Sequence, residues 1–268
     1  MGKKNNLSTG ANGAANAMWI YGIHAVDAVL KNPRRKILKI MLTRDSEILV
    51  EDKKLLPKLQ IVEKDVFASM FGNAIHQGCA VLVEHLPECA LEDLVADESD
   101  NRPFVFLDQV QDPQNIGSIL RAAAVFGARA IAMTDKNSPK ISSAIAKTAS
   151  GALEIIPFVR VVNMIQAINY LKNKGFWCIG LDERADKYLH EIPMKKSDKY
   201  ILVIGSEGNG MRRLTRESCD FLVRLPEFGR FSTLNAAQAA TVSLYEIMRQ
   251  RTELEFDSQK ISGKYKGE

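Results

Sequence analysis

The chain has 268 residues, of which 46% are hydrophobic and 25% are charged, and its formal net charge is +4. A chain of this length buries one large core or two smaller ones, and this composition excludes disorder of the whole chain. The mildly basic balance permits a nucleic-acid partner but does not require one.

The four cysteines form no C-x-x-C pair, and no histidine lies at metal-ligand spacing from a second ligand. We therefore expect no metal and no disulfide framework, which indicates a reduced, cytoplasmic protein. No stretch of about 18 apolar residues occurs, so we expect no transmembrane helix and no membrane partner. Residues 1–18 are small and polar and lack the apolar core of a signal peptide, which predicts a disordered tail.

The first ordered part of the chain, residues 19–85, has the pattern of a small α/β domain. Its spacing predicts strands at 36–42, 61–62 and 80–83 and helices over 25–30, 55–60 and 66–71. Residues 86–102 are acidic and polar and end before Pro103, which indicates a linker or an exposed helix at a domain boundary.

The second part, residues 103–251, alternates apolar strands with helices. Phe104–Leu107 is a continuous apolar run, typical of a strand that is buried on both faces. Further elements are predicted as strands at 130–133, 176–181, 200–204 and 221–225, an extended segment at 153–162, and helices over 116–126, 141–149, 163–173 and 235–249. This alternation predicts an α/β domain with a mainly parallel sheet and helices on both faces. Residues 252–268 are polar and are expected to form a flexible tail.

A polar loop joins the strand at 104–107 to the next helix and carries Asn115, with Arg121 six residues further along. Ligands of open α/β sheets bind at the carboxyl ends of the strands, so this junction is a candidate site. Asn115 is either a ligand contact or the cap of the helix. Arg121 lies among small and apolar residues and needs a partner, which is either a structural ion pair or a phosphate or ribose.

A glycine-rich segment, Gly205-Ser206-Glu207-Gly208, follows directly after the predicted strand at 200–204. Glycine lets a ligand approach the main chain, although the spacing is not the G-x-G-x-x-G of dinucleotide-binding proteins. The alternative is a tight turn without a ligand, in which a downstream helix N-terminus attracts the acidic Glu207.

A third segment runs from Leu225 through Pro226 and Gly229 to Thr233-Leu234-Asn235, where the last helix begins. Thr233 and Asn235 are first of all candidates for capping that helix.

Basic residues gather beside the glycine-rich segment and in the small domain. They are Arg212, Arg213, Arg216 and Arg224 in the first group and Lys31, Arg34, Arg35, Lys36 and Lys39 in the second. A solvated helix face explains any one of them as well as RNA does, but together they offer phosphate contacts.

Taken together and in this order, the three segments resemble the motifs of the SpoU (TrmH) family of RNA 2′-O-ribose methyltransferases. The matching residues are Asn115 and Arg121, then Gly205-Ser206-Glu207-Gly208, then Pro226, Gly229, Leu234 and Asn235. Thr233 stands where the family usually has serine, so a hydroxyl is kept. Residues 21–26 and 76–78 resemble the ribosomal-L30e-like, RNA-binding domain of the bacterial members that methylate a guanosine of 23S rRNA. We expect His24 and His76 in these two stretches to be hydrogen-bonded structural histidines.

The resemblance implies a knotted, SPOUT-type fold with a deep trefoil knot near the C-terminus, preceded by the L30e-like domain. It also implies a homodimer whose sites are shared between subunits, S-adenosylmethionine as cofactor, and methylation of a ribose 2′-OH in RNA, with a guanosine of 23S rRNA as the target. By resemblance, the catalytic residues are Asn115, Arg121, Glu207, Thr233 and Asn235, and the cofactor-binding residues are Gly205, Gly208, Leu225 and Leu234. Because arginine stays protonated in proteins, we expect Arg121 to grip a phosphate or ribose rather than to act as a base.

Three alternatives remain open at this point. The first is a transfer-RNA 2′-O-methyltransferase of the same family, and the second is a catalytically silent RNA-binding protein. The third is a nicotinamide-dependent oxidoreductase, which the missing glycine fingerprint argues against.

Overall fold

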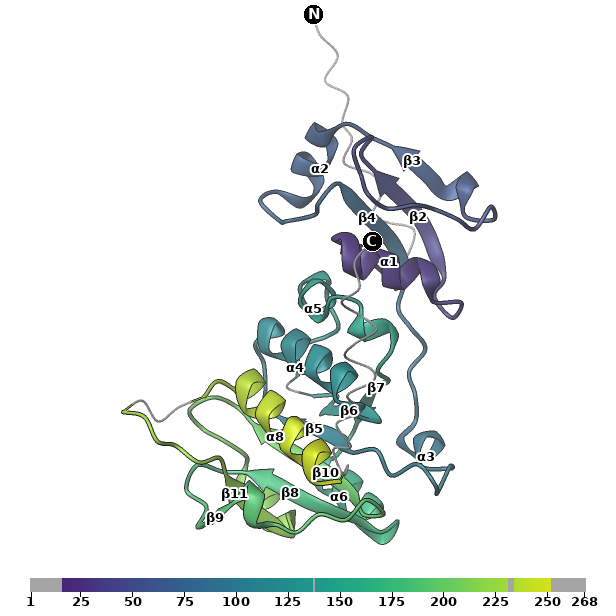
Figure 1. Cartoon of the computed structure of the whole chain (residues 1–268). Helices are drawn as coiled ribbons and strands as arrows, with labels where there is room; N and C mark the ends of the chain where they lie inside the picture. The colour runs from purple at the N-terminus through teal and green to yellow at the C-terminus, as the bar shows by residue number, and fades with distance from the viewer. Residues whose placement is uncertain (1–15, 137, 231–233, 252–268) are drawn as a thin grey trace, which may run out of the picture.

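The computed structural model of the protein describes residues 16–136, 138–230 and 234–251, which form two sheets joined by an extended segment (Figure 1). The small sheet lies at one end of the molecule and the large sheet at the other.

The small sheet comes from the first part of the chain. Its elements are β1 (Ala17–Tyr21), α1 (Ile23–Lys31), β2 (Ile37–Leu42), η1 (Leu56–Lys58), β3 (Leu59–Ile61), α2 (Lys64–Phe71) and β4 (Cys79–Glu84). The strands lie in the order β1-β4-β2-β3, with β2 and β3 parallel and the other pairs antiparallel.

Two details of this part differ from the sequence prediction. Strand β1 was not predicted, and it begins at Ala17, within the segment that was expected to be a disordered tail. The helix predicted over 55–60 is wrong, because only one 3₁₀ turn forms there. Pro57 fits the first turn of a helix, and the next residues pair with β2 as the short strand β3.

The two faces of the small sheet pack on different elements. Ile20 and Val81 belong to a buried core that also contains Val26 of α1. On the opposite face, the rings of Trp19 and Tyr21 lie 5.6 and 5.4 Å from the ring of Phe71 in α2. One face of the small sheet therefore packs against an apolar core with α1, and the other face packs against the aromatic ring of α2.

The large sheet comes from the second part of the chain. Its elements, with the preceding short helix, are α3 (Leu91–Leu94), β5 (Phe104–Asp108), α4 (Pro113–Val125), β6 (Ala130–Thr134), α5 (Ser143–Ala149), η2 (Ala152–Glu154), β7 (Phe158–Val161), α6 (Met164–Asn173), β8 (Phe176–Leu181), β9 (Lys187–Tyr188), η3 (Leu189–Glu191), β10 (Lys199–Gly205), α7 (Arg213–Ser218), β11 (Phe221–Arg224) and α8 (Ala236–Arg251). The strands lie in the order β7-β6-β5-β10-β8-β11-β9, and every pair is parallel.

Side chains of the large sheet alternate between two cores. In β5, Val105 and Leu107 belong to the core that contains α4, α5 and α8, whereas Phe104 and Phe106 belong to the core that contains α6. All five residues of this strand are buried. The predicted α/β fold, with a mainly parallel sheet covered on both faces, is confirmed; the trefoil knot stays a prediction.

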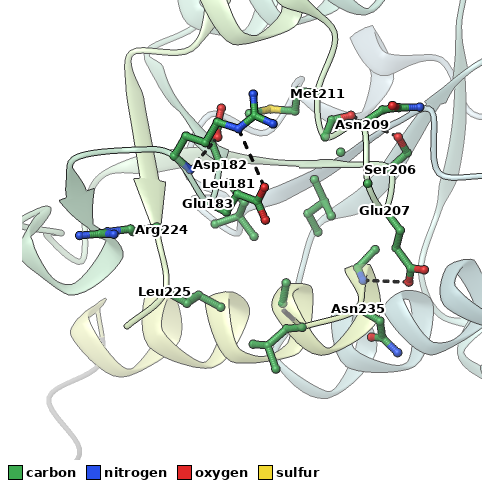
Figure 2. Close-up of a pocket in the computed structure, with 18 of the residues that line it drawn as sticks. Leu181, Asp182, Glu183, Ser206, Glu207, Asn209, Met211, Arg224, Leu225 and Asn235 are labelled. Carbon is green, nitrogen blue, oxygen red and sulfur yellow. Dashed lines mark hydrogen bonds and ion pairs between the residues drawn. The ribbon is translucent and has the colours of Figure 1, made fainter. Parts of the chain in front are cut away.

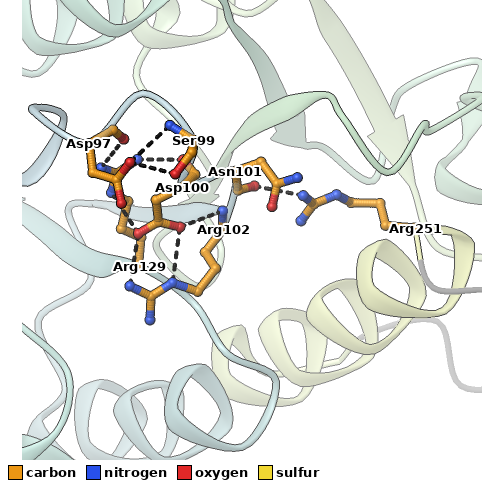
Figure 3. Close-up of polar contacts among 7 residues, drawn as sticks. All are labelled: Asp97, Ser99, Asp100, Asn101, Arg102, Arg129 and Arg251. Carbon is orange, nitrogen blue, oxygen red and sulfur yellow. Dashed lines mark hydrogen bonds and ion pairs between the residues drawn. The ribbon is translucent and has the colours of Figure 1, made fainter.

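The segment expected to link the two domains is fixed to the large one. Arg129 donates hydrogen bonds of 2.6 and 3.0 Å to the carbonyl oxygens of Asp100 and Asp97, and Arg251 at the end of α8 donates one of 2.7 Å to the carbonyl of Asn101 (Figure 3). The last residues before β5 are therefore held on the large domain by two guanidinium groups.

None of the helices in the described ranges combines the length and the apolar character that crossing a membrane requires. In the same ranges, no three His, Cys, Asp or Glu residues are grouped so that they could hold a metal ion.

Candidate active site

The carboxyl ends of β5, β10, β8 and β11 meet at one edge of the large sheet. Because these strands are parallel, the loops that follow them lie side by side. The register places Asp108, the last residue of β5, beside Gly205, the last residue of β10. The three segments singled out in the sequence start from β5, β10 and β11, so the topology brings them together.

The loop after β10 is a tight turn. Ser206 and Gly210 exchange backbone hydrogen bonds of 3.1 and 2.9 Å, and the φ angles of Gly208 and Gly210 are +79° and +66°. A Cβ on Gly205 would lie 2.2 Å from the carbonyl carbon of Gly210 and 2.3 Å from the nitrogen of Met211. Only glycine fits at position 205, because the chain folds back directly over it.

Glu207 connects the three segments. Its Oε1 accepts a hydrogen bond of 2.8 Å from Asn115 Nδ2 and a longer one of 3.4 Å from the backbone N–H of Ala236, the second of which is visible in Figure 2. Asn115 is buried within α4, and the N-cap of that helix is Asp112, which accepts from the N–H of Gln114. The alternative that Asn115 caps the helix is therefore wrong.

Asn235 caps α8, as its place in the sequence predicted. Its Oδ1 accepts from the N–H of Gln238 at 2.8 Å, and its own N–H donates to Gln238 Oε1 at 3.2 Å, so the two residues form a capping box. Thr233, the other predicted cap and site residue, lies outside the described residues.

These loops enclose a cavity of about 670 Å³, a usual size for a small-molecule site. Its wall includes two of the predicted catalytic residues and all four predicted cofactor-binding residues, namely Glu207, Asn235, Gly205, Gly208, Leu225 and Leu234. Asn115 is not part of the wall, and its hydrogen bond to Glu207 links it to the residues that are.

Arg121 lies elsewhere. It is exposed on α4 and is not part of the cavity wall. It forms no hydrogen bond or ion pair with any residue that the structure describes, so the structural ion pair considered above does not form there.

The part of the cavity that follows β8 was not predicted from the sequence. Asp182 and Arg216 both line the wall and pair with each other, with Arg216 Nε 2.6 Å from Asp182 Oδ2 (Figure 2). The rule that ligands bind after parallel strands could have found Asp182, because the strand before it was predicted.

Asp108 was also missed. It is fully buried, and it accepts hydrogen bonds from the backbone N–H of Arg212 at 2.9 Å and from Arg212 Nε at 2.8 Å. This carboxylate ties the residue before α7 to the end of β5, so it anchors the chain that leaves the glycine turn.

The basic groups are engaged in more contacts than the sequence suggested. Arg35 is buried against Glu154, which makes it unavailable to RNA. Beside the glycine turn, Arg213 pairs with Glu217. Arg212 pairs with Asp108, and Arg216 pairs with Asp182.

His76 is a structural histidine, as expected. Its Nδ1 accepts a hydrogen bond of 3.1 Å from the N–H of Gly78, and its ring stacks on Phe67 with centroids 4.6 Å apart.

Comparison with known families gives two matches. A family described as SpoU rRNA methylase matches residues 102–245, and a domain described as RNA 2′-O ribose methyltransferase substrate binding matches residues 19–88.

Similar proteins and structures carry related names. The 23S rRNA (guanosine-2′-O-)-methyltransferase RlmB of Coxiella burnetii is 37% identical over 240 residues, which cover 87% of this chain and 95% of that protein. RlmB of Pseudomonas aeruginosa is 36% identical over 249 residues, covering 88% and 98%. The crystal structure of the SpoU methyltransferase AviRb from Streptomyces viridochromogenes with AdoMet superposes with a TM-score of 0.74 at 23% identity, covering 88% of this chain and 91% of that one. At that identity, the structural likeness speaks for the fold alone.

Proposed function

Because the chain belongs to the SpoU rRNA methylase family, we propose that it methylates a ribose 2′-OH of RNA with S-adenosylmethionine, and that its target is a guanosine of 23S rRNA. The relatives that are 36–37% identical carry this activity in their names and align along almost their whole length. The match of residues 19–88 to a substrate-binding domain supports an RNA contact by the small sheet.

The cavity suits this cofactor in size and chemistry. Leu225 and Leu234 offer apolar surface to an adenine ring, and the position of Gly208 is open where a Cβ would stand. The ammonium and carboxylate groups of the methionine part need charged partners, and Glu183 and Arg184 lie on the wall. When bound, S-adenosylmethionine would supply an electrophilic methyl group: the methyl–sulfur bond breaks as the bond to the ribose 2′-oxygen forms, the neutral thioether is the leaving group, and the hydroxyl proton is lost.

Glu207 is placed to organise the acceptor side of the site. Its Oε1 is occupied by Asn115 Nδ2 and the N–H of Ala236, while its Oε2 has no hydrogen bond to any described residue. A carboxylate oriented in this way can accept the proton of the ribose hydroxyl; water and a phosphate oxygen are the other acceptors. The reaction depends mainly on placement of the nucleophile.

Arg121 acts, in this proposal, from a second subunit of a homodimer. It is exposed and lies off the cavity wall of its own chain. Exposed apolar side chains lie on the same helix and on the helix packed against it: Val125 of α4 is 71% exposed, and Val242 and Tyr245 of α8 are 45% and 43% exposed. A dimer along α4 and α8 buries these groups and brings the guanidinium to the partner's ribose or phosphate.

The observation that carries the proposal is the convergence of Asn115, Glu207 and Ala236, which come from three distant segments. The test is Arg121→Ala, with tritiated S-adenosylmethionine and a 23S rRNA transcript. We expect turnover to fall about 100-fold or more because a charge-stabilising donor is lost. Cofactor affinity, measured by calorimetry, is expected to stay the same. Arg102→Ala, which removes an exposed arginine far from the site, is the control. Equal loss of turnover and cofactor affinity would make Arg121 a structural residue.

Subunit sharing has its own test. Arg121→Ala and Glu207→Ala protomers are mixed, unfolded and refolded together. If the sites are shared, about a quarter of the wild-type activity returns, since half of the dimers are mixed and each has one intact site. No recovery would contradict a shared site.

The alternatives are separated by substrate and by binding. Methylation of a transfer-RNA transcript in preference to 23S rRNA would favour the transfer-RNA enzyme, and undetectable S-adenosylmethionine binding would favour the silent RNA-binding protein. With 23S rRNA as substrate, we place the protein in the cytoplasm, where that RNA is made.

A further inference from the structure

A buried ion pair joins the two sheets outside the active site. Arg35, between α1 and β2, has its Nη2 2.5 Å from Oε1 of Glu154 in η2, and the two side chains are only 1% and 4% exposed. Arg35 Nε and Asn32 Nδ2 both donate to the other oxygen of Glu154, at 3.0 and 2.8 Å. Arg35 Nη1 also donates to the carbonyl of Glu84, so each charged group has partners.

The backbone next to this pair is shaped for close contact. A Cβ on Gly151 would lie 2.7 Å from Ala28 Cβ and 3.2 Å from the carbonyl oxygen of His24. Ser150 and Gly151 both have positive φ, 51° and 93°, and they turn the chain from α5 into η2 under α1. Such a conformation is costly for serine and persists where surrounding contacts fix it.

A second polar link lies nearby. Gln77, which also has a positive φ of 55°, accepts hydrogen bonds at Oε1 from the N–H of Ile23 and from Lys147 Nζ, at 3.2 and 3.1 Å. The same amide thus caps α1 and holds α5. One residue further along α5, Thr148 Oγ1 donates a hydrogen bond of 2.7 Å to Gln114, the neighbour of Asn115 in α4.

The apolar core is also continuous across the junction. Met18 and Ile20 of β1 belong to the same buried cluster as Ile145 of α5 and Ile116 of α4. Figure 1 shows α1 facing α5 at this place. The two parts of the chain therefore share one core as well as the extended segment between them.

We propose that Arg35 and Glu154 are positioning residues for RNA methylation, which they serve by holding the substrate-binding half of the chain at a fixed distance from the methyl-transfer site. This inference rests on the proposed function. An RNA that contacts both halves binds tightly only if their spacing matches the spacing of its two contact sites. Without the ion pair, Arg35 is left buried without its carboxylate partner, the junction between the two halves loosens although the shared core remains, and that match is weakened.

The experiment compares Glu154→Ala, Glu154→Gln and wild type as full chains. Glutamine keeps the volume and one acceptor oxygen, so it still gives a result if the alanine variant does not fold. With a 23S rRNA transcript, we expect KM for RNA to rise about tenfold for alanine and less for glutamine. We expect kcat and the calorimetric affinity for S-adenosylmethionine to stay within about twofold, since Glu154 touches neither the cavity nor Glu207. X-ray scattering should show a larger radius of gyration for Glu154→Ala.

Asp27→Asn is the matched control, because it removes an exposed ion pair with Lys31 on the same small domain. It should change neither KM nor the scattering. An unchanged KM in a variant whose radius of gyration has grown would overturn the inference, as would an equal loss of cofactor affinity. The proposed function would be refuted separately if the wild-type chain bound the cofactor but methylated neither the 23S rRNA nor a transfer-RNA transcript. If its scattering still showed the fixed arrangement of the two domains, the geometry of the junction would be unaffected by that result.

Discussion

The large sheet and the small sheet are both α/β layers, but they present their polar groups in different ways. In the large sheet every strand pair is parallel, so the carboxyl ends of β5, β10, β8 and β11 lie at one edge of the sheet. The loops that follow these strands form one cavity. In the small sheet most pairs are antiparallel, and the strand ends are divided between two edges. A parallel sheet thus brings the polar side chains of several loops together at one edge.

The small sheet instead groups aromatic side chains on one of its faces. Trp19 and Tyr21 of β1 lie against Phe71, and Phe67 stacks on His76. Phe67 is fully buried and the other rings are half-buried, so this layer of rings holds α2 against the sheet. The parallel sheet therefore gathers polar side chains at one edge around a cavity, whereas the mostly antiparallel sheet uses one face to hold a helix.

The largest expected effect concerns packing. Phe106→Ala, in a strand buried on both faces, should lower the free energy of unfolding by about 4 kcal/mol. Phe71→Ala, in the partly exposed aromatic layer, should cost about half of that. Urea denaturation followed by circular dichroism measures both values. Equal losses would remove the contrast between the two layers.

The next prediction compares the substitution of a glycine at the cavity, Gly205, with the substitution of a glycine in the small domain, Gly72. Gly205→Ala places a methyl group against the Gly210 carbonyl, and we expect S-adenosylmethionine affinity to fall about 100-fold, or about 3 kcal/mol. Gly72→Ala has a positive φ but open space around it, so it should cost about 1 kcal/mol of stability and leave cofactor binding unchanged. Calorimetric titration of both variants is the measurement, and normal binding by Gly205→Ala would contradict the tight turn.

Each sheet also buries a cysteine thiol, and this burial predicts slow alkylation of both thiols. Burial raises the pKa of Cys79 in β4 to about 11, and the hydrogen bond with Cys219, followed by burial, raises the pKa of Cys178 in β8. At pH 8, about one Cys79 side chain in 1,000 is a thiolate, so alkylation should be about 100-fold slower than for an ordinary thiol. The raised pKa means that the neutral thiol favours the folded state, and stability is lost as pH rises from about 9 through 11. Mass spectrometry after iodoacetamide treatment tests this, with the partly exposed Cys89 as the internal reference.

The smallest effect compares two ways of capping a helix. In the large domain Asn235 caps α8 from within its own segment, whereas α1 in the small domain is capped by Gln77, 54 residues away. Asn235→Ala should cost about 1 kcal/mol and fray only α8. Gln77→Ala should cost a similar amount but also raise hydrogen exchange in α5, because Lys147 loses its acceptor. Unchanged exchange in α5 would show that the remote cap acts locally.

Local pattern was enough to predict most of the large sheet. The apolar runs of β5 and β10 and the capping residue of α8 are signals carried by neighbouring residues, and each gave the correct element. Strand β1 was missed because Tyr21 and Gly22 were read as the approach to a helix. The two-residue strand β9 is too short for any periodicity.

The site could be predicted in its segments but not in its contacts. Asn115 and Glu207 are 92 residues apart, and nothing local indicates that an amide inside α4 meets a carboxylate after β10. Arg35 and Glu154 are 119 residues apart, and a run of basic residues looked like an RNA contact although one member is buried. Such pairings are set by the tertiary fold, because only the fold decides which charges are withdrawn from water.

The order of the large sheet has a consequence for how the protein is made. Strand β10 lies between β5 and β8 but is synthesised after both. Until residue 205 has emerged from the ribosome, each of these strands keeps an open edge, and open edges invite pairing with other chains. The cavity needs still later residues, up to position 239. Until β10 is made, the nascent chain therefore holds β7, β6 and β5 with an open edge at β5 and a β8 that has neither of its neighbours, and the binding site is finished only after residue 239 has emerged.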